Sequence, residues 1–138
     1  MSKICTDLEQ SRKLLSLGID KNTADMHYFS DGYNPIKLDV GYSAENAKFY
    51  RGTENEYIPA WSLTALLNIA PKYFSKENHQ FVQSYSYDHI DGCYHFIYRD
   101  YQHGGRSKYI SKNKDLFDAA FEMVCWLLEN GYIKKSKK

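Results

Sequence analysis

The residues best suited to metal binding or catalysis lie close together in the second half of the chain. His89, Cys93, His95 and His103 fall within 15 residues, and imidazole and thiolate groups are ligands that zinc prefers. Cys93 and His95 are two residues apart, so on a strand both point to one face and can chelate one ion. The spacing matches no paired C-x-x-C pattern, and a half-exposed strand histidine is the simpler explanation. We therefore predict no metal ion and no cofactor.

The same segment contains the one cysteine–histidine pair that is close enough in sequence to act as nucleophile and base. A cysteine hydrolase also needs a third group that orients the imidazole, and no carboxylate or amide is obviously placed for that role beside Cys93 and His95. A phosphate-binding loop is not indicated either, because Gly104-Gly105 lacks the lysine and the following helix of such a loop. We predict no catalytic residue, and a metal- or cysteine-dependent hydrolase around Cys93 and His95 is the third hypothesis for the function.

Tyrosine is the most distinctive feature of the composition. The 138-residue chain contains 13 tyrosines, and 16% of its residues are aromatic. Tyrosine combines an apolar ring with a hydroxyl that needs a partner, so it suits half-buried sheets and recognition surfaces. We predict a non-enzymatic binding protein whose tyrosine-rich strands contact a protein partner or a second copy of the chain. The predicted binding residues are Trp61, Tyr85, Tyr87, Tyr98, Arg99 and Arg106.

Binding of single-stranded nucleic acid is the alternative hypothesis. Tyrosine rings can stack on bases while nearby basic side chains contact phosphates. The formal net charge of only +1 gives no global attraction to nucleic acid. In addition, the face that carries Tyr94, Phe96 and Tyr98 is also the natural face for helices to cover. The residues considered for this role are Tyr85, Tyr87, Tyr94, Tyr98 and Tyr101, with Arg99, Arg106 and Lys108.

The elements that must position these residues are predicted strands. Two aromatic, β-favouring runs flank Asp91-Gly92, a dipeptide that is typical of hairpin turns. Earlier segments also alternate apolar and polar residues, whereas residues 43–57 are predicted to form an irregular loop. The predicted strands span residues 26–29, 36–42, 81–87, 93–101 and 107–110.

Three helices are predicted to pack on these strands. The longest apolar segment spans residues 115–131, and Gly131 is placed to end it in a left-handed conformation, so we predict that it is the core helix. Residues 7–17 form a second helix, with a capping box at Thr6–Glu9 and Gly18 at its end. The third begins at Pro59, or with Ser62 as an alternative N-cap, and ends before Pro71.

The order of these elements predicts the fold class. The strands occur in groups, which indicates an α+β fold with three helices on one face of a mainly antiparallel sheet of four to five strands. The length suits one domain, residues 1–138, with residues 133–138 as a disordered basic tail. Three cysteines without short spacing imply no disulfide framework. We see neither a signal peptide nor a membrane-spanning run, and therefore predict a cytoplasmic protein.

Three segments together resemble a known family. They are Leu17-Gly18-Ile19 with Thr23-Ala24-Asp25-Met26, Pro59 to Leu63 with Ala65-Leu66-Leu67, and the run from Glu122 to Ile133. The chain resembles small uncharacterised proteins of phages and integrated mobile elements in gut Bacteroides-type bacteria. The resemblance covers most of the chain except residues 31–57. The resemblance implies that the gene belongs to a phage or mobile element and that the protein acts in the cytoplasm of the bacterial host. It transfers no site residue.

Overall fold

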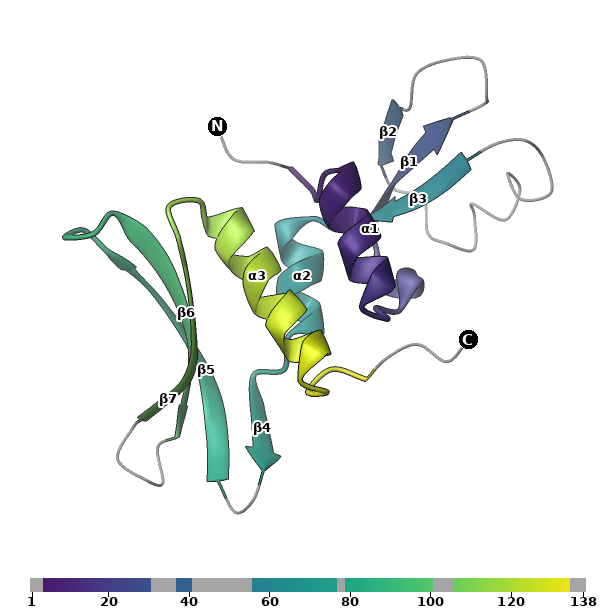
Figure 1. Ribbon diagram of the computed structural model, residues 1–138. Coiled ribbons are helices and arrows are strands. Elements are labelled where there is room, and N and C mark those ends of the chain that lie inside the picture. Colours follow the sequence, from purple (N-terminus) through teal and green to yellow (C-terminus); the bar gives the residue numbers. More distant parts are fainter. Residues whose placement is uncertain (1–3, 31–36, 41–55, 77–78, 101–105, 135–138) are drawn as a thin grey trace.

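The computed structural model describes residues 4–30, 37–40, 56–76, 79–100 and 106–134. Within these residues the chain forms three α-helices, one short 3-10 helix and seven strands in two antiparallel sheets. The predicted α+β class is therefore confirmed. The strands are divided between two sheets, however, whereas the sequence indicated a single one. Figure 1 shows the helices between the larger sheet on the left and the smaller sheet at the upper right.

The larger sheet contains the predicted hairpin. Its strands are β4 (Tyr73–Lys76), β5 (His79–Asp88), β6 (Cys93–Asp100) and β7 (Arg106–Asn113), in that order. Every neighbouring pair is antiparallel, and Gly92 in the β5–β6 turn has the positive φ of 71° that the prediction requires. β4 is absent from the prediction, because its two aromatic residues are followed by two polar ones and the segment does not alternate.

The smaller sheet corrects the prediction for the middle of the chain. It consists of β2 (Lys37–Val40), β1 (Met26–Ser30) and β3 (Glu56–Ala60), in that order. β3 contains Pro59, which the sequence placed at the start of a helix. Among the strands that the structure describes, β3 pairs with β1 alone, and an edge strand tolerates the missing N–H of proline. Residues 43–55 of the predicted loop lie outside the described residues.

The second helix, α2, begins later than Pro59 for a local reason. α2 spans Leu63–Ile69, and the Oγ of Ser62 accepts a hydrogen bond from the amide of Ala65 at 3.1 Å. Ser62 is therefore the N-cap, as the alternative reading of the sequence predicted. The carboxylate of Asp25 in turn accepts hydrogen bonds from both the amide and the hydroxyl of Ser62. This contact fixes the start of α2 beside β1.

The first helix, α1 (Leu8–Ser16), is capped one residue later than predicted. Asp7 accepts from the amide of Gln10 at 2.8 Å, and the Gln10 side chain accepts from the amide of Asp7 at 3.1 Å. The predicted capping residue, Thr6, has another role. Its hydroxyl is fully buried and accepts from the amide of Trp61 at 3.1 Å. The capping box therefore exists, but Thr6 joins α1 to the end of β3 instead.

The last helix, α3 (Leu116–Glu129), is the core helix that the sequence predicts. Asp115 caps it by accepting from the amides of the first turn. Gly131 and Gly18 end α3 and α1 at φ values of 77° and 92°, as predicted. After α3 the amide of Tyr132 donates back to the last turn, and its ring stacks on neighbouring aromatic side chains.

Nine of the 14 residues of α3 are buried, so it packs on two sides. One side meets α1 and α2, and the other meets the larger sheet. None of the helices in the described part of the chain has the length and apolar character that a membrane crossing requires. The side toward α1 and α2 includes Leu14, Trp61, Leu66, Val124 and Leu128, and the side toward the sheet includes Phe81, Phe96, Tyr98, Met123 and Leu127.

Candidate binding surface

The face of the larger sheet that meets α3 is covered at one end. There Phe81, Phe96 and Tyr98 are buried against α3 residues that include Met123. The hydroxyl of Tyr98 donates to the carbonyl oxygen of Pro71 at 2.8 Å. Burial raises the pKa of Tyr98 to about 12. Because the ring and the hydroxyl are both enclosed, Tyr98 cannot contact a partner, which corrects its prediction as a binding residue.

Beyond α3, the same face of the sheet carries exposed aromatic rings. Tyr85 and Tyr87 on β5 are 68% and 55% exposed. They lie opposite Phe96 and Tyr94 on β6, with ring centroids 5.7 Å apart for Tyr85–Phe96 and 4.9 Å apart for Tyr87–Tyr94. Such cross-strand aromatic pairs stabilise a sheet. Here they also hold the two exposed rings in defined positions.

Two more exposed hydrophobic side chains lie at the two ends of this stretch. Ile90 in the β5–β6 turn is 88% exposed, and Tyr73 at the start of β4 is 65% exposed. Within the described residues, six large hydrophobic side chains are exposed, and four of them belong to this edge, with Tyr73 on the opposite face of the sheet from Tyr85 and Tyr87 because it pairs with Val82. Clustered apolar exposure is typical of interaction sites. We refer to Tyr73, Tyr85, Tyr87 and Ile90 as the aromatic edge.

Among the described residues, the backbone of β5 is open along the aromatic edge. β4 pairs only with His79–Val82, and the amide of Gln83 then donates to the carbonyl just before β4 at 2.8 Å. In the part of the chain that the structure describes, no strand lies against Ser84–Asp88 on that side. Alternate residues of an antiparallel strand direct their N–H and C=O to the same side, so Tyr85 and Tyr87 direct theirs as Gln83 does. The edge can therefore accept an added strand.

Trp61, another predicted binding residue, lies elsewhere and is fully buried. It packs in the cluster formed by α1, α2 and α3, and its indole N–H donates to the Oγ1 of Thr23 at 2.9 Å. Its prediction as a surface residue is therefore wrong. Aromatic residues at an element boundary occur both in cores and on surfaces, and only the packing of α1 against β3 decides this case.

The predicted arginines do not join the exposed tyrosines. Arg99 lies on the face of β6 opposite to that of Tyr98, because adjacent strand residues point to opposite sides. Arg106 is the first residue of β7, and its side chain lies outside what the structure describes. Of the six predicted residues, the structure thus brings together only Tyr85 and Tyr87. Ile90, an apolar residue inside a polar turn, is a signal that the sequence reasoning missed.

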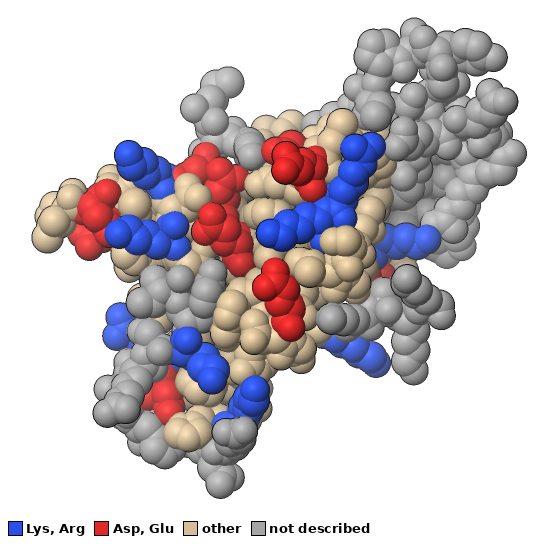
Figure 2. Space-filling view, viewed as in Figure 1, with Lys and Arg blue, Asp and Glu red and all other residues tan. Residues whose placement is uncertain are grey.

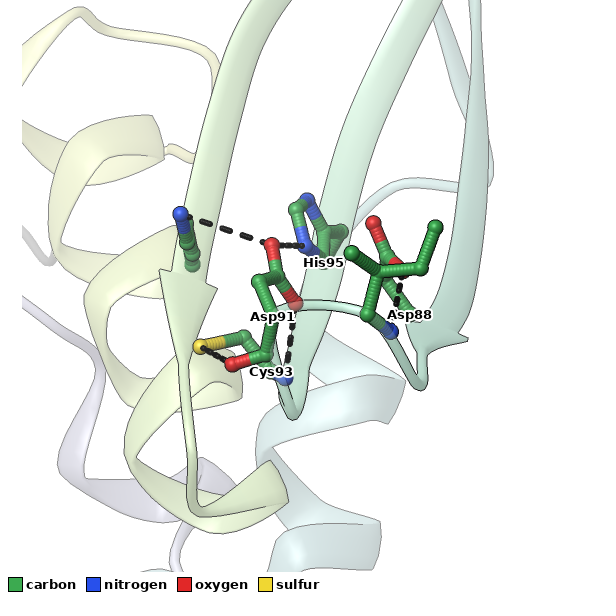
Figure 3. Close-up of polar contacts among 6 residues, drawn as sticks. Asp88, Asp91, Cys93 and His95 are labelled. Atoms are coloured by element: carbon green, nitrogen blue, oxygen red, sulfur yellow. Dashed lines mark hydrogen bonds and ion pairs between the residues drawn. The ribbon is translucent and has the colours of Figure 1, made fainter.

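The β5–β6 turn brings two carboxylates, those of Asp88 and Asp91, close to His95, which the sequence singled out (Figure 3). One atom each of Asp88, Asp91 and His95 lies within 4.8 Å of the other two. The Oδ2 of Asp91 is 3.0 Å from His95 Nε2 and 3.4 Å from Lys112 Nζ. Partial dehydration raises the pKa of Asp91, but the Cys93 amide, His95 and Lys112 together lower it further than dehydration raises it. The Lys112 ammonium would repel a metal cation at this position. The contacts of Asp91 with His95 and Lys112 stabilise the turn instead.

The cysteine–histidine pair is not arranged as a nucleophile and its base. Cys93 is buried, and its thiol donates to the carbonyl oxygen of Asp91 at 3.5 Å. The imidazole of His95 contacts the Asp91 carboxylate instead. Activation of a thiol requires hydrogen-bond contact with the base, so the hydrolase hypothesis gains no support from this geometry. His89 is exposed in the turn, and His103 lies outside the described residues.

A cavity of about 750 Å³ lies between the 3-10 helix η1 (Lys21–Thr23), α2 and the segment after α3. Its size is within the range of small-molecule pockets, and apolar residues such as Ile19 and Ile69 line it. Two carboxylates also line it, but Asp20 caps η1 and Asp25 holds the start of α2. The lining includes neither histidine nor cysteine, so it offers no nucleophile or base of the kind that the sequence singled out.

Comparison of this chain with known protein families, with characterised proteins and with solved structures finds no match. Residue roles therefore cannot be transferred from a relative, and the functional argument depends on geometry. At the aromatic edge, exposed aromatic side chains and open backbone groups coincide. The aromatic edge is accordingly the candidate binding surface.

Proposed function

We propose that this chain is a non-enzymatic binding protein that contacts a protein partner through the aromatic edge. The observation that carries the proposal is the exposure of Tyr85 and Tyr87 beside an open strand. A partner that adds an extended strand to β5 gains main-chain hydrogen bonds, while the two rings supply contact area and selectivity. Tyrosine is enriched in protein interfaces because its large ring loses little conformational freedom on binding.

The sequence of the open edge supports strand addition. Natural sheet edges commonly carry lysine, proline or a bulge, which prevent unwanted pairing. Ser84–Tyr87 contains none of these residues, and its pairing with β6 is regular. An unprotected edge is tolerated when its pairing serves a function, and we assign it that role here.

We further propose the setting that the family resemblance implies, an accessory protein of a phage or mobile element in the cytoplasm of a Bacteroides-type host. The three cysteines are buried and unpaired with one another, which suits a reducing compartment. Burial raises the pKa of the Cys5 thiol, and it raises that of Cys125 to about 11. Protonated, enclosed thiols are poor nucleophiles, in keeping with a binding role.

Single-stranded nucleic acid is the second candidate partner, favoured by the exposed rings of Tyr85 and Tyr87. A stacking platform also needs basic side chains beside the rings. Tyr98 is buried and Arg99 lies on the other face of the sheet, so these two residues do not join Tyr85 and Tyr87 on one surface as the nucleic-acid hypothesis requires. Figure 2 shows acidic and basic side chains interspersed over one face of the molecule, an arrangement that gives phosphates little net attraction.

Site-specific photocrosslinking tests the proposed function. Benzoylphenylalanine is introduced at Tyr85 or Tyr87, and the full chain is irradiated in a lysate of a Bacteroides-type host. We expect a covalent adduct with a polypeptide at both positions, because a strand added to β5 lies within reach of both rings. Leu15 is the matched control, since it is a partly exposed hydrophobic residue on α1, away from the edge.

The composition of the adduct separates the candidate functions. A protease-sensitive adduct at Tyr85 and Tyr87 that is absent at Leu15 supports the protein contact. An adduct that nuclease removes supports the nucleic-acid alternative, and Tyr87→Ala should then weaken binding to an oligonucleotide in a salt-dependent way. Equal labelling at all three positions, or none, contradicts a binding role for the edge.

A further inference from the structure

We infer that the strand added to the aromatic edge is β5 of a second copy of this chain. The inference depends on the proposed function and specifies its partner. Two copies pair antiparallel about Ser86, and their larger sheets join into one continuous sheet. The two copies then use the same surface, as the interface of a two-fold symmetric dimer requires.

The open edge can pair with the same edge of a second copy along its whole length. The β5–β6 turn limits it at one end, and the hydrogen bond from Gln83 to the chain entering β4 limits it at the other. The open segment between these limits is Ser84–Asp88, and its central residue is Ser86. Antiparallel pairing of this segment with itself places Ser86 opposite Ser86 of the second copy, with no open residue left over.

The direction of the backbone groups fits this register. Tyr85 lies opposite Tyr87 of the second copy, and both residues direct N–H and C=O to the open side. Each Tyr85–Tyr87 pair exchanges two main-chain hydrogen bonds, and the two-fold symmetry creates two such pairs, so about four main-chain hydrogen bonds form. The rings of each pair lie on the face that meets α3. They extend the aromatic pairs that Tyr85 and Tyr87 already make with β6.

The charges along the edge permit the pairing. A two-fold axis brings identical side chains together, so a charged residue at the centre would repel its own copy. Ser84–Tyr87 carries no charge. The one charged residue of the open segment, Asp88, falls opposite Ser84 of the second copy and not opposite itself. Like-charge repulsion across the paired strands is therefore avoided.

The same register accounts for the rest of the aromatic edge. An antiparallel second copy runs with its turn toward the start of β4, which brings its Ile90 next to Tyr73. By symmetry the opposite contact forms as well. One symmetric contact therefore places all four exposed hydrophobic residues along the joined edge, with Tyr73 on the face opposite to that of Tyr85 and Tyr87 because Tyr73 pairs with Val82. An unrelated short strand would contact Tyr85 and Tyr87 alone.

Two variants that introduce opposite charges at Ser86 test the inference. Ser86 is exposed and points away from the face that meets α3. Sedimentation equilibrium from about 1 µM to about 1 mM should show a monomer–dimer equilibrium for the unmodified chain. Ser86→Lys and Ser86→Asp each place like-charged side chains directly opposite one another, with Cβ atoms about 5 Å apart across the axis, and should weaken dimerisation roughly fivefold or more. An equimolar mixture of the two variants should restore a dimer.

Gln80 provides the matched control. It is exposed and occupies the same face of β5 as Ser86, but β4 covers its edge of the strand. Gln80→Lys and Gln80→Asp should therefore dimerise as the unmodified chain does. A difference between the two positions attributes the effect to the register about Ser86 and not to added charge alone.

Three results would overturn the inference. They are an unmodified chain that stays monomeric, a dimer that is indifferent to both charges at Ser86, and variants that are weakened separately but not restored together. A crosslink from Tyr85 to a different protein would then leave the proposed function standing. Loss of every polypeptide crosslink would remove the proposed function as well, so the two failures are distinguishable.

Discussion

The two halves of β5 both place aromatic side chains on the face that meets α3, but their surroundings differ. The first half, His79–Val82, pairs with β4, and its Phe81 is buried beneath α3. The second half, Ser84–Asp88, continues the same alternation of aromatic and polar residues, but Tyr85 and Tyr87 are exposed. Phe81, Tyr85 and Tyr87 all point to the same face of the sheet. The difference therefore depends on what covers that face and not on the strand itself.

This comparison shows that one strand can serve both stability and recognition. Where α3 and β4 meet β5, aromatic side chains remove apolar surface from water and stabilise the fold. Where that cover ends, side chains of the same type are held by the rigid sheet but remain available to a partner. The covered half should therefore respond to mutation in its free energy of unfolding, and the open half in its binding.

Replacement of a covered and an open tyrosine by alanine should give the largest contrast. Tyr98→Ala deletes a fully buried ring and should lower the free energy of unfolding by about 3–5 kcal/mol. Tyr85→Ala removes an exposed ring with one cross-strand contact and should cost about 1 kcal/mol or less. Urea denaturation followed by circular dichroism measures both values. Similar losses at the two positions would contradict the division of this face of the sheet into a covered part, which includes Tyr98 on β6, and an open part, which includes Tyr85 on β5.

Removal of the Tyr98 hydroxyl alone should have an intermediate effect. Tyr98→Phe keeps the ring but leaves the Pro71 carbonyl and the side-chain Nε2 of Gln83 without this partner, at a cost of about 1–2 kcal/mol. The pKa of Tyr98 is raised to about 12 in the folded state. The stability from the neutral phenol is therefore fully present below the ordinary tyrosine pKa of about 10, and is lost as the pH rises toward 12.

Denaturation between about pH 9 and pH 12 tests this coupling. The advantage of the unmodified chain over Tyr98→Phe should shrink across this interval. Tyr87→Phe is the matched control, because Tyr87 is exposed on the same face. A constant difference between the unmodified chain and Tyr98→Phe would show that the buried hydroxyl is not linked to folding.

Loosening of the turn next to the open half should have the smallest effect. The pKa of Asp91 is lowered in the folded state, so its ionised form contributes stability above the ordinary carboxyl pKa. That contribution is lost as the pH falls through the lowered value. Asp91→Asn should therefore be slightly less stable than the unmodified chain at neutral pH, and the difference should disappear in acid.

Amide hydrogen exchange locates the effect of Asp91→Asn. Exchange should accelerate in Ser84–Asp88 and stay unchanged at Phe81, because the turn supports only the open half of β5. Asp88→Asn is a useful comparison, since Asp88 accepts a hydrogen bond only from the amide of Ile90 among the contacts described for its side chain. Uniform acceleration along β5 would mean that the two halves unfold as one unit.

Much of the fold follows from local interactions that the sequence alone determined. Gly18 and Gly131 end their helices because left-handed backbone conformations strongly favour glycine. Asp91-Gly92 turns the chain between two aromatic strands for the same reason. The apolar character of residues 115–131 identified the core helix, because such a helix must be covered on several sides. These signals act within a few residues, so no tertiary contact is needed to interpret them.

The candidate site depends on contacts that only the tertiary structure decided. Tyr85, Tyr87 and Tyr98 follow the same strand pattern, yet α3 covers only Tyr98. Trp61 is buried because α1, distant in sequence, packs against β3, and Pro59 lies in a strand because β3 is at a sheet edge. Residue type and spacing state which side chains can form a surface. Whether they do depends on the extent of the helix that covers the sheet, and that is set by long-range packing.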